Sequence, residues 1–173
     1  GESSNVEEIR YEGYAPGGVA LIVDALTDNR NRTAAEVRSS FAKYGGNLGE
    51  TGSVSFMFNN VGQILYQKNV KSDDEIFEIA IEVGATDVKS DETNYEIITL
   101  VNEFNNVREK LENLLGTPDQ ADLIWYPENY IQIDDEKKAT SILKLLDTLD
   151  NCEDVQGVYG NFEITANTSW ISY

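Results

Sequence analysis

The chain has 173 residues, 40% of them hydrophobic and 25% charged, a composition typical of a folded protein with one large or two small domains. It contains 31 acidic residues, 13 basic residues and no histidine, which excludes histidine-dependent catalysis and the usual histidine-containing zinc sites. The net charge of −18 argues against nucleic-acid binding through overall charge alone.

Neither a membrane span nor a secretion signal is expected. No apolar run approaches the roughly 18 residues that cross a bilayer, and the opening sequence GESSNVEEIR does not resemble a signal peptide. The single cysteine, Cys152, cannot form an internal disulfide and fits a reducing compartment. Because no histidine can activate it, we expect Cys152 to be a small packed side chain. The sequence therefore predicts a soluble protein.

The first third of the chain predicts a hairpin, a helix and a further strand. Residues 9–14 alternate apolar and polar side chains, and residues 19–26 are a short β-branched apolar run, so each predicts a strand. The intervening YAPGG is typical of a turn. Thr33 and Glu36 have the spacing of a capping box, which predicts a helix from Thr33 to the glycines at 45–46. The run VSFMF at 54–58 predicts the next strand.

The rest of the chain predicts two further strand–helix patterns. Residues 60–127 read as β-α-β-β-α-β, with a second capping box at Ser72–Glu75 and a hairpin around residues 90–94. Residues 128–165 read as β-α-β, with Asp134 or Asp135 capping the helix and one strand over 158–164. The acidic runs at 73–75, 134–136 and 153–154 lack the spacing of a calcium loop, and two of them fit helix caps, so no metal site is predicted.

This order of elements predicts an α+β protein with two ferredoxin-like α/β sandwich domains, one inserted into the other. Residues 60–127 form a complete ferredoxin-like unit, and the flanking halves, 9–59 plus 128–165, would form a discontinuous outer domain. Residues 1–8 and 166–173 are expected to be flexible ends. A single mixed sheet is the alternative architecture.

The stretch from Tyr11 to Ser53 concentrates seven of the thirteen glycines and three of the five arginines. The sequence NRNR at 29–32 lies just before the predicted helix, where arginines are suited to phosphate or RNA backbone. The alternative is a solvated loop whose arginines pair with Asp24, Asp28 or Glu36, and the residues alone leave both open. The YAPGG segment lacks phosphate-loop spacing, so the pattern favours a tight turn there over a ligand cradle.

Three long segments resemble the YebC/PmpR family, which includes the mitochondrial translational activator of cytochrome c oxidase subunit I. They are YEGYAPGGVALIVDALTDNRNRTAAEVRSSFAKYGGNLGETGSVSFMF, DDEIFEIAIEVGATDV and YPENYIQIDDEKKATSILKLLDTLDNCEDVQGVYGNFEI, and the similarity covers nearly all of residues 8–164. One small departure is Ala15, where the family usually has glycine before PGG. The resemblance implies a basic helical N-terminal domain and two α/β domains, the third inserted into the second. The helical domain, with most of the basic charge, is expected to be missing from this chain.

The resemblance also implies a non-enzymatic regulator of gene expression without cofactor or small-molecule substrate. Family members have been regarded as DNA-binding transcriptional regulators or as translation factors. We expect a monomeric, ribosome-associated translation factor that contacts rRNA or tRNA, mainly through the missing basic domain. The alternatives are a DNA-binding transcriptional regulator and a protein-interaction module. Bacterial cytoplasm is the expected location, with the mitochondrial matrix as the alternative.

The expected contact residues all lie in the Tyr11–Ser53 stretch. The polar and basic candidates are Asn29, Arg30, Asn31, Arg32, Arg38 and Lys43. Two loops are expected to allow close approach of a nucleic acid, and their residues are Gly13, Tyr14, Pro16, Gly17, Gly18, Gly45, Gly46, Asn47 and Gly49.

Overall fold

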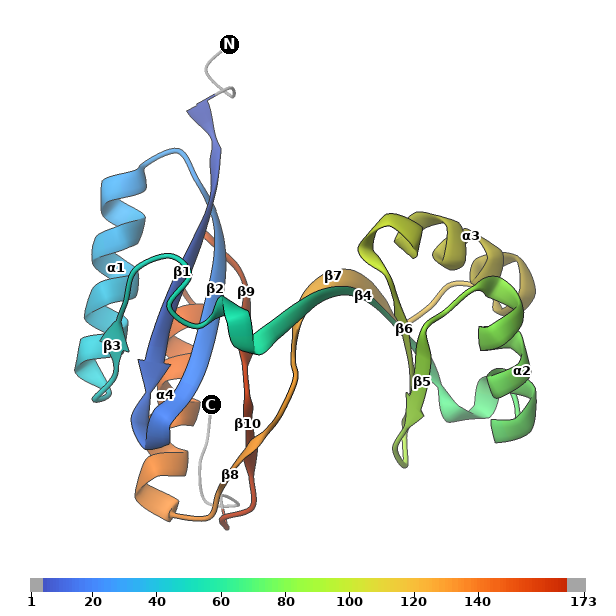
Figure 1. Cartoon of the computed structure of the whole chain (residues 1–173). Coiled ribbons are helices and arrows are strands. Elements are labelled where there is room, and N and C mark those ends of the chain that lie inside the picture. The colour runs from blue at the N-terminus through green and yellow to red at the C-terminus, as the bar shows by residue number, and fades with distance from the viewer. Residues whose placement is uncertain (1–4, 168–173) are drawn as a thin grey trace. The chain divides into compact units, whose positions relative to one another are not determined.

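The computed structural model describes residues 5–167 and divides into two compact units (Figure 1). The outer unit comprises residues 1–59 and 126–173, and the inserted unit comprises residues 60–125. The predicted flexible ends, 1–8 and 166–173, lie partly outside the described residues, but Glu7 and Glu8 already belong to the first strand. No helix within residues 5–167 is both long enough and apolar enough to cross a membrane.

The outer unit contains a four-stranded antiparallel sheet in the order β3-β1-β2-β9. Its strands are β1 (Glu7–Ala15), β2 (Val19–Thr27), β3 (Asn47–Leu48) and β9 (Val155–Gly160). β1 and β2 form the predicted hairpin, joined by a short 3-10 turn at Pro16–Gly18. A separate parallel pair is formed by β8 (Ile131–Ile133) and β10 (Phe162–Ile164).

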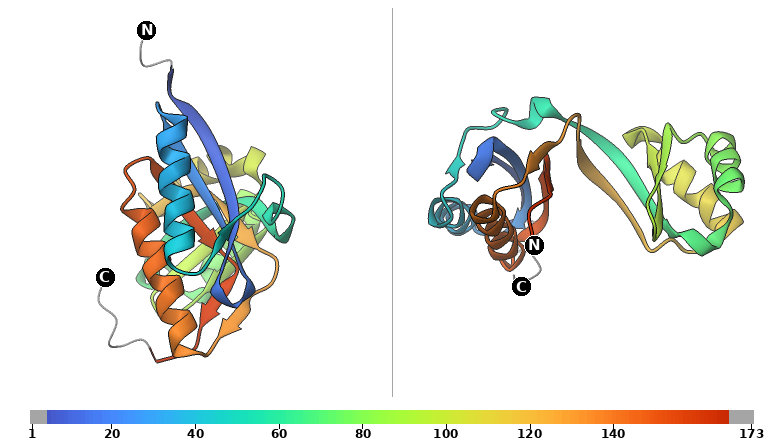
Figure 2. Two further views of the ribbon diagram at one scale, coloured as in Figure 1. Left: turned by 90° about the vertical axis from the view of Figure 1, so that its left-hand side faces the viewer. Right: turned by 90° about the horizontal axis from the view of Figure 1, so that it is seen from below.

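Both helices of the outer unit, α1 (Arg30–Lys43) and α4 (Glu136–Asp150), lie side by side on one face of this sheet (Figure 2). We call α1 and α4 together the helix layer. Apolar residues at helical spacing on both helices pack against alternate residues of β2 and form one core. Its fully buried members are Val19, Leu21, Val23, Val37, Phe41, Ala139, Ile142, Leu145 and Leu149.

The opposite face of the outer sheet is covered in part by an irregular segment, residues 49–57, which a buried carboxylate holds in place. Ile22 and its cross-strand neighbour Glu12 point to this face, and both are almost fully buried. The Glu12 carboxylate accepts hydrogen bonds from three backbone amides of the segment, those of Gly52, Val54 and Ser55, at 2.6–3.0 Å. The Glu12 carboxylate also forms an ion pair with Arg10 at 3.0 Å.

These contacts set the ionisation of Glu12. Burial alone raises the pKa of a carboxyl group, but the three amide donors and Arg10 outweigh it and lower the pKa of Glu12 from its ordinary 4.5 to about 2. The amides of an irregular segment need acceptors, and here the two oxygens of one side chain accept from three amides.

The inserted unit is a ferredoxin-like α/β sandwich. Its elements are β4 (Phe58–Gln67), α2 (Asp73–Val83), β5 (Asp87–Ser90), β6 (Asn94–Thr99), α3 (Phe104–Leu115) and β7 (Gln120–Pro127). The sheet order, β5-β6-β4-β7, places the first and third strands of the unit in the centre, as that fold requires. Its core is built from one face of each helix and the facing strands, with Ile64, Ile97, Val107 and Leu111 fully enclosed.

The structure confirms the predicted α+β class and most of the predicted helix ends. Ser72 accepts from the amide of Glu75 at the start of α2, and Asp135 accepts from that of Lys138 at the start of α4. Gly84 ends α2 in the left-handed conformation. The β5–β6 hairpin also forms where it was predicted, and Asp91 organises its turn through the amides of Thr93 and Asn94.

Two predictions about single elements are wrong. Helix α1 begins at Arg30 with Asn29 as its cap, and not at Thr33, whose hydroxyl donates to Asp154. Residues 54–58 do not form one strand, since Ser55–Met57 is a 3-10 turn and β4 begins only at Phe58. The amides of Val54 and Ser55 donate to Glu12 and not to a neighbouring strand. Both errors have one origin, a long-range partner that local patterns do not reveal.

The outer unit also differs from the ferredoxin arrangement in strand order. The single strand expected over 158–164 is divided at Asn161. The Asn161 side chain accepts from the amide of Ala20 at 2.8 Å, and its carbonyl accepts from Ile131, so the chain passes there from the large sheet to the β8–β10 pair. The large sheet therefore receives only β9 from the C-terminal half.

Replacing Glu12 by glutamine is expected to destabilise the outer unit, because one amide oxygen cannot accept the bonds that two carboxylate oxygens accept now. The pKa shift corresponds to about 3 kcal/mol of unfolding free energy. Because the folded-state pKa is lowered, this stabilisation is present above pH 4.5 and is lost as the pH falls towards 2. Urea unfolding across this window will show a flatter pH profile for Glu12→Gln than for the wild type; equal slopes would contradict this assignment.

Candidate nucleic-acid interface

The start of α1 is fixed by a cluster of polar side chains around Asp154. Asp154 Oδ2 accepts from the hydroxyl of Thr33 at 2.7 Å and that of Thr27 at 3.2 Å. Arg32 donates to the same oxygen at 2.8 Å. Thr27 in turn accepts from the amide of Asn29, the helix cap. This cluster ties the end of β2, the start of α1 and the residue before β9 into one hydrogen-bonded unit.

The cluster keeps Asp154 ionised. Its hydrogen bond from Arg32, followed by that from Thr33, lowers the pKa of Asp154 below its ordinary value. Arg32 also lies 3.4 Å from Asp28. Arg32 therefore pairs with a nearby acid, as one of the two alternatives for the NRNR segment predicted. Its second partner, Asp154, was not predicted.

The other residues of this segment have different surroundings. Asn29 accepts from the amide of Arg32 at 3.1 Å as the helix cap, and Asn31 is exposed. Arg30 lies 3.6 Å from Glu7, but both side chains are more than half exposed, so the pair contributes little. Arg30 therefore remains accessible, whereas Arg32 is held.

The predicted cations of α1 lie at separate places along the helix. Arg30 and Arg38 both lie near the Tyr11 hydroxyl, where burial raises the pKa of Tyr11 and the two arginines partly offset that rise. Lys43 lies at the other end of α1, 5.4 Å from the centre of the Tyr44 ring. The helix rises about 1.5 Å per residue, so Arg30 and Lys43 are roughly 20 Å apart along it.

Lys43 is joined by a lysine of α4. A hydrogen bond from Thr148 of α4 lowers the pKa of Tyr44, and the positive charges of Lys43 and Lys144 lower it further. The two lysines therefore approach the same phenol from neighbouring helices. Lys138, in the first turn of α4, lies beside the hairpin turn, 3.6 Å from the position that a Cβ on Gly17 would occupy.

The two glycine loops meet each other at this end of the outer unit. Tyr14 pairs with Asn47 across β1 and β3, and Pro16 lies against Gly45. A side chain at Gly13 would lie 2.6 Å from the carbonyl oxygen of Asn47, and one at Gly46 would collide with that of Tyr14. These glycines are thus needed for close packing of the chain on itself. Gly17 and Gly18 are the exposed residues at the tip, and both have positive φ.

The helix layer has a charge opposite to that of the whole chain. α1 and α4 together hold seven basic and four acidic residues, a balance of +3, whereas the rest of the chain holds six basic and 27 acidic residues, a balance of −21. Within the described part of the chain, five exposed cations of this layer form no ion pair. They are Arg38, Lys43, Lys137, Lys138 and Lys144.

Three of these five cations, those of α4, were missed by the sequence analysis. The available signal was the pair of lysines at 137–138 in the first turn after the predicted cap. By contrast, three cations of the inserted unit are paired, Lys68 with Asp73, Lys71 with Glu75 and Arg108 with Glu112, at 3.2–3.8 Å. Among the described residues, Lys110 of the inserted unit also forms no ion pair, but most of the cations without one lie on the helix layer.

The sequence of residues 6–162 matches the family model described as the TACO1/YebC second and third domain. The chain belongs to the TACO1/YebC family. It is 55% identical over 163 residues to a probable transcriptional regulatory protein of Rickettsia bellii, covering 94% of this chain and 64% of that protein. A protein of the same description from Rickettsia felis is 52% identical, with 94% and 65% covered. The chain therefore spans slightly less than two thirds of the length of these relatives.

A solved TACO1/YebC-like structure agrees with the fold. A conserved hypothetical protein from Aquifex aeolicus superposes with a TM-score of 0.87 at 47% sequence identity, covering 95% of this chain and 68% of that one.

Removing the charge of Asp154 is expected to weaken the start of α1. Asp154→Asn places an amide group where Oδ2 now accepts from Arg32 and Thr33, and each lost bond costs about 1 kcal/mol. Because the pKa of Asp154 is lowered on folding, its contribution is present above the ordinary carboxyl pKa and is lost on acidification. Denaturant unfolding at pH 7 measures the effect, with the exposed neighbour Glu153→Gln as the charge-matched control. Equal losses in both variants would contradict the role of the cluster.

Proposed function

We propose that this chain is the α/β part of a non-enzymatic regulator of gene expression that acts as a ribosome-associated translation factor in the bacterial cytoplasm. In this proposal the helix layer contacts the phosphate backbone of rRNA or tRNA. The observation that carries it is the set of five exposed cations on the helix layer that form no ion pair with any residue of 5–167, in a chain that is otherwise strongly acidic. Where acids outnumber bases so heavily, leaving these cations unpaired favours an anionic partner from outside the chain.

The arrangement of the cations favours backbone contact over base recognition. Four of the five are lysines, which act as mobile point charges and do not provide the planar bidentate fork that reads guanine edges. Both helices pack lengthwise on the sheet and against each other, so neither projects as a helix that could enter a major groove. A broad helical surface with lysines suits the surface of a folded RNA.

The glycine-rich turns have a narrower part in this proposal. Gly13 and Gly46 are needed for packing of β1 on β3, whereas the exposed tip at Gly17–Gly18 beside Lys138 is the point where a phosphate backbone could approach closely. Arg30, Arg38 and Asn31 would extend the contact along α1. A basic helical domain, which the family resemblance implies, would supply the main grip, and the helix layer would be a secondary contact.

The second candidate is a DNA-binding transcriptional regulator, and the names of the Rickettsia relatives favour it. It requires saturable, sequence-dependent binding to duplex DNA with a steep dependence on salt.

The test is co-sedimentation with purified ribosomes over a range of salt concentrations. The triple variant Lys43→Ala/Lys138→Ala/Lys144→Ala is expected to bind more weakly, and the slope of log affinity against log salt should fall by about two. The charge-matched control is Lys71→Ala/Lys89→Ala/Lys110→Ala in the inserted unit, which should bind as the wild type does. Equal loss in both variants would refute the assignment of the helix layer, and sequence-dependent binding to DNA without ribosome binding would establish the second candidate.

A further inference from the structure

Helix α2 of the inserted unit has an apolar stripe that is wider than its buried face. Ile76, Ala80 and Val83 are buried against the sheet, as an amphipathic helix requires. Phe77 and Ile81, one turn apart on the adjoining sector, are 57% and 65% exposed. Two large apolar side chains that stand together on one helix face contribute nothing to the core of the unit. They form a small, continuous apolar surface.

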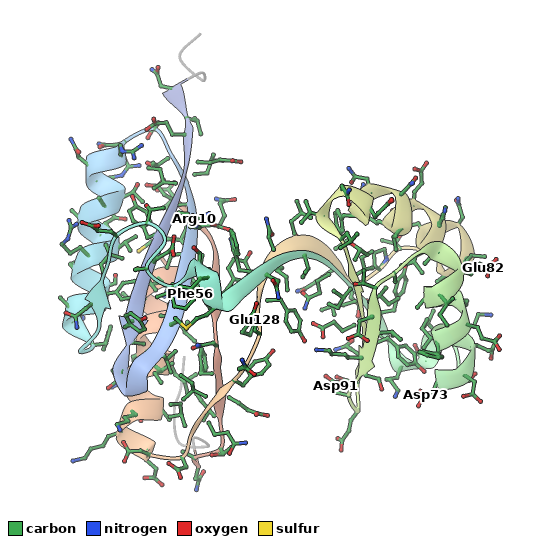
Figure 3. All side chains as sticks on the ribbon, viewed as in Figure 1. Arg10, Phe56, Asp73, Glu82, Asp91 and Glu128 are labelled. Atoms are coloured by element: carbon green, nitrogen blue, oxygen red, sulfur yellow. The ribbon has the colours of Figure 1, made fainter. Side chains whose placement is uncertain are left out.

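A row of carboxylates runs beside this apolar pair. Asp74, Glu78 and Glu82 follow one another at intervals of four residues, so they lie along one line on the helix, next to Phe77 and Ile81. None of the three forms an ion pair within the described part of the chain. Figure 3 shows Asp73 and Glu82 at the two ends of the helix, which carries five acidic residues and no basic one.

This row opposes the stability of the helix that carries it. Like charges four residues apart destabilise a helix. Glu82 is also in the last turn, where the helix dipole favours cations, and that turn contains no basic residue. The acids at the beginning of α2 are accounted for by capping and by ion pairs with Lys68 and Lys71, but Glu78 and Glu82 have no such role in the fold.

We propose that the face of α2 formed by Phe77, Ile81 and the carboxylate row docks a basic segment of another protein, one with an apolar anchor flanked by lysines or arginines. Charge complementarity selects this occupant: a cationic segment would relieve the repulsion within the carboxylate row while its apolar anchor covers Phe77 and Ile81. Nucleic acid is disfavoured because it would meet the carboxylates. The site is in the inserted unit and is independent of the helix layer that we assign to RNA.

The first experiment uses the whole chain and a fluorescein-labelled 18-residue helical peptide with leucines on one face and lysines beside them. Fluorescence anisotropy will give its affinity at low and moderate salt. We expect Phe77→Ser/Ile81→Ser, which keeps all charges, to weaken binding about tenfold. The matched control is Leu114→Ser/Leu123→Ser, two similarly exposed apolar residues of the same unit, which should leave binding unchanged. Equal losses in the two variants would overturn the proposal.

The second experiment distinguishes a docking role from a structural one by the sign of two effects. Glu78→Gln/Glu82→Gln should raise the thermal stability of the chain, because it removes like-charge repulsion, and should weaken peptide binding several-fold. The charge-matched control, Glu103→Gln/Glu109→Gln, should weaken it far less. A loss of stability in Glu78→Gln/Glu82→Gln would overturn the proposal. So would concentration-dependent dimerisation abolished by Phe77→Ser/Ile81→Ser, which would assign the face to a second copy of the chain.

Discussion

The buried carboxylate of Glu12 is the constraint on which the outer unit depends. Helices cover only one face of the outer sheet, and on the other face the irregular segment over residues 49–57 brings amides that need acceptors. Glu12 solves this with a single side chain, because its two oxygens receive the amides of Gly52, Val54 and Ser55 and the Arg10 guanidinium. The segment over residues 49–57 can therefore bury Val54 without forming a strand of its own.

A second carboxylate has the corresponding role at the other end of the chain. Asp154 joins the start of α1 to the C-terminal half of the outer unit, much as Asn161 joins β10 and β8 to β2. The outer unit is assembled from two segments separated by the whole inserted unit, so contacts of this kind are what connect them. Each uses a polar side chain that is nearly or partly buried and whose partners are more than a hundred residues away in sequence.

These contacts also explain where prediction from sequence succeeded. Elements determined by local chemistry were found: the cap at Ser72, the stop at Gly84, and the hairpin around Asp91. The alternation of elements in 60–127 was enough to indicate a ferredoxin-like unit, because every strand of that unit pairs within it. Thr33 and the 54–58 run were misread because their partners, Asp154 and Glu12, are distant in sequence. The division of the predicted strand at Asn161 was missed for the same reason, since no local sequence pattern marks the passage from one sheet to another.

The candidate site was predictable to a smaller extent. Richness in glycine and arginine led to the prediction of a contact surface, but several of these residues have a structural role: Gly13 and Gly46 allow β1 and β3 to approach, and Arg32 neutralises Asp154. The helix-layer cations that form no ion pair with a described residue are distributed over two helices that are far apart in the sequence. Only the pairing of α1 with α4 brings Lys43 and Lys144 to the same tyrosine. A linear motif cannot contain such a surface.

The net charge of the chain also says little about its binding surfaces, because the charges are unevenly distributed in the fold. A total of −18 conceals a helix layer at +3 and a helix, α2, that carries five acids and no base. Electrostatic attraction between exposed groups is screened beyond about 10 Å at ordinary salt, so a partner responds to the charge of the surface that it touches and not to the sum. A chain divided in this way can present cations to an RNA backbone from one unit and carboxylates to a basic protein from the other. An assembly of RNA and basic proteins offers both kinds of surface, and the uneven distribution of charge in this chain is compatible with both at once.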